Sequence, residues 1–185
     1  MILVKQHQNQ FIHVAWCSLM DLCFSVDGYV LERTNEIGYT LECTKQSVLR
    51  SVDDHEKEGS EFWIDILLSF VTAALDDPKN EILILRRSDG RRAGMLWMCR
   101  SKDQYTCDDT GYIMGIFVEP ELRGNGLGRA LLKTAEDWCS EKGLMSVTLN
   151  VSPLNDALGL YEKCGFRERS VVMRKDLPGS RGSFL

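Results

Sequence analysis

The chain has 185 residues, and its 22 Lys and Arg against 27 Asp and Glu give a formal net charge of −5. A field of this sign favours neither nucleic acid nor an anionic membrane surface, so neither is expected as a partner. The length favours one domain with an ordinary core. Its seven scattered cysteines show no zinc-like spacing, which indicates reduced thiols in a cytoplasmic protein and no metal site.

The first 60 residues carry weak structural signals. Residues 1–4 predict a short strand, and residues 10–24 place apolar side chains at helical spacing. Polar residues interrupt this part of the chain, which argues against a signal peptide or a membrane span. From Asp27 to Ser60 we expect loops with one short helix near 45–52. The acidic run at 53–61 is interpreted as a solvated loop or as a surface that steers a cationic substrate.

The middle of the chain predicts one helix followed by three antiparallel strands. Helical spacing of apolar residues extends over 60–75. Two apolar runs, 81–86 and 92–100, flank an Asp89-Gly90 pair that is typical of a tight hairpin turn. A third run at 111–118 follows a second turn, and its Gly115 is a place where a bulge or a close packing contact is expected.

The last third of the chain predicts alternating helices and strands. A helix is expected from about 126 to 142, closed by a glycine, and a strand over 144–151. A short helix over 154–163 and two closing strands within 166–177 follow. Residues 178–185 are interpreted as a loose tail.

The stretch between the third strand and the next helix, Glu119–Arg129, has the composition of an anion site. Its glycines alternate over five positions, at Gly124, Gly126 and Gly128. They leave backbone amides open to a ligand. The helix that begins here adds unpaired N–H groups and the positive end of its dipole. Arg123 and Arg129 add positive charge, so the stretch predicts a phosphate or pyrophosphate ligand.

The glycine spacing excludes two common phosphate-binding families. A dinucleotide fingerprint needs a G-x-G-x-x-G frame, and the third glycine of that frame would fall on Arg129. The strand that follows carries Asn150 and Val151 where a ribose-binding carboxylate would be expected. A Walker-type loop requires Gly-Lys-Ser or Gly-Lys-Thr, and neither is present in the sequence.

The stretch and its flanks resemble the GCN5-related N-acetyltransferase (GNAT) family. That family's signature is an Arg or Gln, two free positions, Gly, one free position, then Gly or Ala, and it corresponds here to 123–128. The Val118-x-Pro120 before it fits as well. A block at 160–166, Leu-Tyr-Glu-Lys-Cys-Gly-Phe, resembles the family's closing helix, and 173–177 resembles its last strand. The likeness covers 111–177, whereas the first half matches only in the order of elements.

The resemblance implies an α/β (α+β) protein with a GNAT-like acyl-CoA N-acyltransferase fold, in which a mixed, mostly antiparallel sheet carries helices on both faces over residues 1–177. It implies acetyl-CoA as the acyl donor, with the acetyl or a longer acyl group left open. The donor's pantetheine would pair with a freed strand edge, and an N–H near Ile116 would face the thioester oxygen. The donor-binding residues that follow from the resemblance are Ile116, Phe117, Val118, Arg123, Gly124, Asn125, Gly126, Leu127, Gly128, Arg129 and Asn155.

The resemblance also assigns catalytic groups. Tyr161 matches the tyrosine that supplies a proton or hydrogen bond to the departing thiolate. Many members have an Asn seven positions before that tyrosine, but here Asn155 lies one residue closer. Some members place a catalytic Glu where this chain has Asn150, which cannot act as a base. The proton therefore leaves through ordered water or another carboxylate, and Glu119 is one candidate.

The expected acceptor is a primary amine of a small molecule or of a peptide or protein. We expect its pocket to be built by the first two helices and the variable segment 27–60, with aromatic side chains in its wall: Tyr29, Tyr39, Phe62 and Trp63. The main alternative is a non-catalytic module that binds or senses acyl-CoA, because the family-type Glu is missing. A homodimer is compatible with the sequence.

Overall fold

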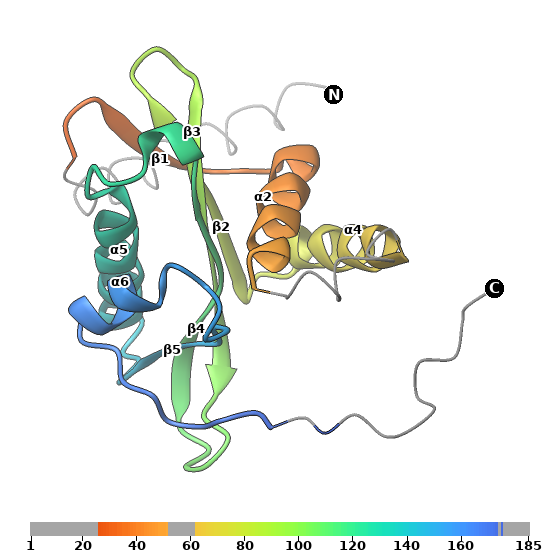
Figure 1. Cartoon of the computed structure of the whole chain (residues 1–185), viewed down its shortest axis with the longest axis vertical. Helices are drawn as coiled ribbons and strands as arrows, with labels where there is room; N and C mark the ends of the chain where they lie inside the picture. The colour runs from red at the N-terminus through yellow and green to blue at the C-terminus, as the bar shows by residue number, and fades with distance from the viewer. Residues whose placement is uncertain (1–25, 52–61, 174, 176–185) are drawn as a thin grey trace, which may run out of the picture.

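A five-stranded sheet forms the centre of the molecule (Figure 1). The structure is a computed structural model and describes residues 26–51, 62–173 and 175. The strands, which neighbour one another in chain order, are β1 (Tyr29–Arg33), β2 (Asn80–Arg87), β3 (Arg92–Lys102), β4 (Asp109–Val118) and β5 (Val147–Leu149). The first four are antiparallel and β5 runs parallel to β4. The predicted mixed, mostly antiparallel sheet is confirmed.

Helices cover both faces of this sheet (Figure 1). One face carries α2 (Ile37–Leu49) and α4 (Phe62–Asp76), and the other carries α5 (Leu127–Glu141) and α6 (Leu158–Lys163). A single 3-10 turn, η1 (Pro120–Leu122), joins β4 to the glycine-rich loop. The predictions for the helices at 60–75 and 126–142 and for the three central strands are therefore correct. Those for 1–4, 10–24, 53–61 and 178–185 lie outside the described residues.

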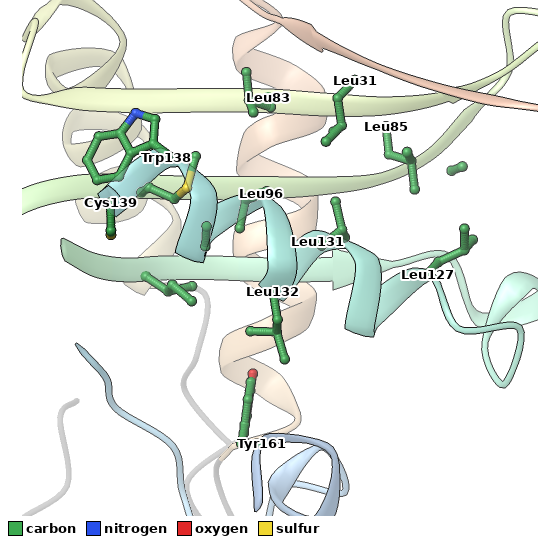
Figure 2. Packing of buried hydrophobic residues seen from close by; sticks show 14 of the residues in the cluster. Leu31, Leu83, Leu85, Leu96, Leu127, Leu131, Leu132, Trp138, Cys139 and Tyr161 are labelled. Carbon is green, nitrogen blue, oxygen red and sulfur yellow. The ribbon is translucent and has the colours of Figure 1, made fainter. Parts of the chain in front are cut away.

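Two hydrophobic clusters hold the layers together because the central strands are apolar on both sides. On the α5 face, leucines of α5 and of the sheet pack with Trp138 (Figure 2). On the other face, Val71 and Ala74 of α4 and Cys43 of α2 cover Met95 and Trp97 of β3. Each fully buried leucine or methionine contributes about 2 kcal/mol through the removal of its side chain from water.

The pairing of β4 changes half-way along the strand. Its partner on β3 shifts by one residue, since Trp97 faces Gly115 while Met98 faces Ile113, which leaves Met114 as the extra residue of a bulge. On the other side, β5 pairs only with Gly111 to Ile113. Both features expected at Gly115 are present, because the bulge lies beside it and a Cβ there would lie 3.2 Å from Met95 Cε. From Met114 onward β4 has a neighbour on one edge only.

The segment predicted as loops with a short helix contains a strand and a longer helix instead. The sequence pattern does not indicate β1, because Leu31 is its single buried residue. The strand is stabilised by its pairing with β2. α2 begins at Ile37, well before position 45, and buries only Thr40 and Cys43. Glu36, just before it, accepts hydrogen bonds from Arg86 and Arg92 of the sheet. These tertiary contacts outweigh the weak local signal.

The end of the chain also differs from expectation. β5 has three residues rather than eight, because the bulge turns the edge of β4 away from it. The predicted helix over 154–163 begins only at Leu158, since the residues before it form turns. Residues 166–173 contain no strand. Arg169 there forms an ion pair with Asp103 of the β3–β4 loop.

Candidate active site

A cleft of about 790 Å³ opens where β4 parts from β5. Its walls come from the second half of β4, the glycine-rich loop, the start of α5, α6 and the C-terminal half of α2. The structure brings together eleven of the predicted site residues in this wall: Ile116, Phe117, Val118, Arg123, Gly124, Gly126, Leu127, Gly128, Arg129, Asn155 and Tyr161. Asn125 and Glu119 are not part of it.

The free edge of β4 points two backbone donors toward the cleft. The N–H of Glu119 donates to the carbonyl of Ala93 on β3 at 2.9 Å. Donors alternate between the two edges of an antiparallel strand, so the N–H groups of Ile116 and Val118 point away from β3. On that side β4 has lost its strand partner beyond Ile113. The backbone thus presents the donors that an extended ligand or a thioester oxygen would need.

The glycine-rich loop exposes a second group of donors. Gly126 is the N-cap of α5 and has a φ of +81°, a left-handed conformation that glycine adopts without strain. No side chain caps this end of the helix. Asn125 turns its amide back to donate to the carbonyl of Leu122 at 3.2 Å, which fixes the loop from outside the cleft. The unpaired N–H groups of the first turn are therefore left for an anion.

The charge of the cleft is opposite to that of the chain. Of the described residues in its wall, four are cationic: Arg50, Arg123, Arg129 and Lys163. Asp156 is the one carboxylate among them. Because the whole chain carries a net charge of −5, this local excess of cations is not a consequence of composition.

Tyr161 lies on α6 with its ring edge-on to Phe166, the two centroids 5.9 Å apart. Figure 2 shows its hydroxyl directed toward α5 at the border of the α5-face cluster. Burial raises the pKa of Tyr161 to about 12, and the negative charge of Asp156 adds to the shift. The start of α5 packs closely on α6, since a Cβ at Gly128 would lie 2.9 Å from Leu160 Cδ2.

Asn155 and Asp156 connect this side of the cleft to the end of α2. The Asn155 side-chain amide donates to Ser51 Oγ at 3.1 Å, and its Oδ1 accepts the N–H of Ala157 at 2.9 Å. Asp156 forms an ion pair with Arg50. Sequence reasoning missed both charged residues. Asp156 adjoins the predicted Asn155 and could have been found in the same turn, whereas nothing in the sequence marks Arg50.

Glu119 lies in a different hollow, of about 400 Å³, beside the start of α2. Its carboxylate accepts a hydrogen bond from the Tyr39 hydroxyl at 2.8 Å, and Arg92 stacks on the Tyr39 ring. Burial, with Cys43 and Glu119 nearby, raises the pKa of Tyr39.

Neither Tyr29 nor Tyr39, which were expected in an aromatic acceptor wall, lines this cleft, although Tyr39 lines the hollow that contains Glu119. Tyr29 packs against the α5-face cluster and Tyr39 faces Glu119. The side chains of Phe62 and Trp63 lie outside the described part of the structure. The α2 wall is largely polar, with Thr44, Ser47, Val48, Arg50 and Ser51.

Comparison with known families identifies this arrangement. The model of the Acetyltransferase (GNAT) family matches residues 44–166, which is more than half of the chain. The chain belongs to this family. The resemblance seen in the glycine-rich loop and in the Tyr161 block is thereby confirmed.

Several characterised and solved GNAT proteins are similar to this chain. A mycothiol acetyltransferase of Clavibacter sepedonicus is 36% identical over 102 residues, which are 55% of this chain and 31% of the relative. A putative ribosomal protein bS18 alanine N-acetyltransferase of Bacillus subtilis is 32% identical over 106 residues, 56% of this chain and 64% of the relative. The chain thus spans from about a third to under two thirds of these relatives' length.

Solved structures agree on the fold. A putative acetyl transferase from Pyrococcus furiosus superposes with a TM-score of 0.64 at 25% identity, covering 80% of this chain and 99% of that one. The aminoglycoside N-acetyltransferase AAC(6')-Iy, solved in complex with CoA, gives 0.61 at 20% identity, with 81% and 95% covered. In the described part of this GNAT chain, no helix has the length and apolar character to cross a membrane.

Proposed function

We propose that this GNAT protein is an N-acetyltransferase that moves the acetyl group of acetyl-CoA directly to a primary amine. The observation that carries the proposal is the continuity of one cleft, which runs from the unpaired amides at the start of α5, along the free edge of β4, to Tyr161. A pyrophosphate, an extended amide-bearing arm and a thioester follow one another in acyl-CoA in the same order. The CoA found with a fold neighbour is consistent with this donor.

Each part of the donor has a partner in the cleft. The pyrophosphate would lie on the amides from Gly124 to Arg129, with the excess of cations around it. The pantetheine arm would add to the edge of β4 as a strand does. The N–H of Ile116 would face the thioester oxygen and stabilise the negative charge that develops there, worth about 3 kcal/mol.

The chemistry then requires one bond to form and one to break. The amine nitrogen attacks the thioester carbon, a C–N bond forms, and the C–S bond breaks with its electron pair on sulfur. Tyr161 supplies a proton or a hydrogen bond to that thiolate, and its raised pKa of about 12 keeps the hydroxyl protonated at neutral pH. No covalent enzyme intermediate is needed.

The proton of the amine needs an acceptor within hydrogen-bonding reach or one water away. Glu119 is the carboxylate that the sequence suggested for this role, and it faces Tyr39 in a separate hollow. Asp156 lines the cleft near Tyr161 and also suits a cationic amine. We therefore propose that Asp156 receives the proton, directly or through water. Asp156→Asn should lower kcat for every amine, while Glu119→Gln should leave kcat unchanged.

Small molecules and proteins both remain in the proposed acceptor class. The relatives are named for mycothiol, glucosamine 6-phosphate, aminoglycosides and the alanine of a ribosomal protein. These acceptors share an amine and little else, so the polar α2 wall of this chain decides among them.

The decisive experiment incubates the full chain with acetyl-CoA and a panel of amines, and measures released CoA thiol and acetylated product by mass spectrometry. Turnover with at least one primary amine, abolished by omission of acetyl-CoA, is the expected result. Tight binding of acetyl-CoA without turnover of any amine, and no effect of Tyr161→Phe, would instead support a sensing module. Absence of acetyl-CoA binding would overturn both.

A further inference from the structure

A row of hydroxyl groups lines the α2 side of the cleft. Thr44 and Ser47 lie on α2, and Ser51 lies in the turn that ends it. Their spacing of three and four positions places all three on one side of the helix, with Val48 between them. Among the described residues, no carboxylate of α2 lines the cleft. This wall therefore recognises a ligand through hydroxyl oxygens.

Each of these hydroxyls has already used its proton. Thr44 Oγ1 donates to the carbonyl of Thr40 at 2.7 Å. Ser47 Oγ donates to the carbonyl of Cys43 at 2.8 Å, and Ser51 Oγ to that of Ser47 at 3.0 Å. A carbonyl oxygen only accepts, so the hydroxyl is the donor in every pair. What these side chains can still offer to the cleft is lone pairs.

Asn150 faces the same side of the cleft from the end of β5. Leu149 and Val151 pack against the α5-face cluster, so Asn150 between them points toward the face that α2 covers. Burial and the nearby Cys99 thiol raise the pKa of Tyr112, and hydrogen bonds from the backbone and the side chain of Asn150 act in the opposite direction. An amide that turns its N–H group to Tyr112 turns its carbonyl oxygen, an acceptor, the other way.

The row of hydroxyls is separated from the groups assigned to the donor. α2 covers one face of the sheet, whereas α5 and α6 cover the other (Figure 1). A donor with its pyrophosphate on α5 and its arm along the edge of β4 leaves the α2 side to the acceptor. Arg50, the cation on this side, is paired with Asp156. The hydroxyls are thus the groups that an approaching acceptor meets.

We propose that the acceptor carries uncharged hydrogen-bond donors, such as hydroxyl groups, close to its reacting amine, and that Thr44 and Ser47 select for them. A hydroxyl of the acceptor would donate to their oxygens. An ether oxygen or a carboxylate in its place would oppose lone pairs to lone pairs, and an alkyl group would leave the oxygens unpaired. The inference rests on the proposed function, since it names the acceptor class of the same cleft.

The test uses three matched series of amines with the full chain. They are unbranched amino alcohols of two to six carbons, their methyl ethers, and alkylamines of the same length. CoA release with acetyl-CoA gives KM and kcat for each amine. Calorimetric titration of the same amines into the CoA-loaded chain, in which no acetyl group is present, measures binding without turnover.

The variants remove the hydroxyls one at a time. Thr44→Val and Ser47→Ala delete an oxygen, and Thr44→Ser keeps it. Thr72→Val is the matched control, because Thr72 Oγ1 makes the same bond to the carbonyl four positions earlier, but on α4 and outside the cleft wall. Thermal unfolding of each variant verifies folding.

We expect the KM of the best amino alcohol to lie about tenfold below that of its methyl ether and of its alkyl analogue. Thr44→Val or Ser47→Ala should raise that KM toward the value for the ether and leave kcat within about twofold. Thr44→Ser and Thr72→Val should keep the preference. An ether that binds more tightly than its alcohol would overturn the inference, because the wall would then be donating.

Two results separate this inference from the proposed function. If amines are acetylated but alcohol, ether and alkylamine have equal KM values at every length, the selection by hydroxyls is wrong and the acetyltransferase proposal stands. If no amine is acetylated, but the CoA-loaded chain prefers the amino alcohols and loses that preference in Thr44→Val, the selection stands and the acetyltransferase proposal fails. Absence of both turnover and preference overturns both.

Discussion

The helices on the two faces of the sheet are held in different ways. α5 buries seven of its fifteen residues, six of them in the cluster on its face, whereas α2 buries two of its thirteen. α2 is instead held at its ends by charge, through Glu36 with Arg86 and Arg92 and through Arg50 with Asp156. The proposed donor site is thus built on dense packing, and the α2 wall on polar contacts that a ligand can exchange.

The largest expected effect is on the free energy of unfolding, where a buried leucine of α5 is compared with a half-exposed isoleucine of α4. Leu131→Ala on α5 removes a fully buried side chain and should lower the free energy of unfolding by about 3 kcal/mol. Ile66→Ala on α4, where the side chain is 51% exposed, should cost below about 1 kcal/mol. Urea unfolding of both variants measures the two values. Equal losses would show that Ile66 is packed as firmly as Leu131.

Removing the hydroxyl of one tyrosine on each face of the sheet shows which face contributes to kcat. Tyr161→Phe keeps the ring and removes the hydroxyl, so kcat should fall about a hundredfold while the fold persists. Tyr39→Phe, on the other face, should leave kcat within about twofold of the wild type, because its partner Glu119 lies outside the cleft. Steady-state CoA release gives both numbers.

The raised pKa of Tyr161 sets the sign of the pH dependence. With a pKa of about 12 its hydroxyl stays protonated, so kcat should not fall between pH 7 and pH 10 through loss of this proton. A fall of kcat in that range that disappears in Tyr161→Phe would mean that the hydroxyl titrates at a lower pH than the buried position implies.

Two glycines with the same backbone conformation make it possible to distinguish the effect of backbone strain on stability from the loss of a ligand contact. Gly126 in the loop and Gly90 in the β2–β3 turn have φ values of +81° and +83°, and a Cβ at either position would meet no atom within 4 Å. Alanine should therefore destabilise both variants by a similar amount, about 1 kcal/mol. Only Gly126→Ala should also weaken acetyl-CoA, about tenfold, measured by calorimetry. Loss of affinity in Gly90→Ala would argue against a direct role of the loop.

The smallest expected effect is a pH-dependent change in thermal stability at Asp103, which lies near the end of β4 farthest from the cleft. The N–H groups of Thr106 and Tyr105, and then Arg169, hold the pKa of Asp103 at about 2, below its usual range. The stability that it contributes is present above pH 4 and is lost as the pH falls through about 2. Asp103→Asn should melt below the wild type at pH 6, and the difference should narrow toward pH 2. Acetyl-CoA affinity at pH 7 should not change.

The sequence predicted α5 to within one residue at each end because its signals are local. Glycine spacing, helix periodicity and the Asp89-Gly90 turn each depend on neighbours within a few positions. The same signals located the bulge beside Gly115, where Met114 lacks a partner. The order of elements from β2 to α6 followed from them.

The α2 side could not be predicted because its stability and its chemistry come from distant partners. β1 becomes a strand through β2, and α2 is held by arginines about fifty positions away. Arg50 and Asp156 are 106 positions apart in the sequence, and no local sequence pattern predicts their contact. Of the closing strands predicted within 166–177, none is present in 166–173, where Arg169 donates to Asp103, 66 positions earlier.

The bulge in β4 limits what amino-acid substitutions can alter in the cleft. The two donors that it frees toward the cleft belong to the backbone of Ile116 and Val118, so no side-chain replacement deletes them. Sequence drift along this strand can reshape the wall of the cleft, yet the chain keeps the pair of N–H groups as long as the extra residue stays. Alanine substitutions along this strand would leave both backbone donors in place, so an alanine scan would not detect their contribution. Replacement of the Ile116 amide by an ester, which removes one hydrogen-bond donor and leaves every side chain in place, is the substitution that would expose it.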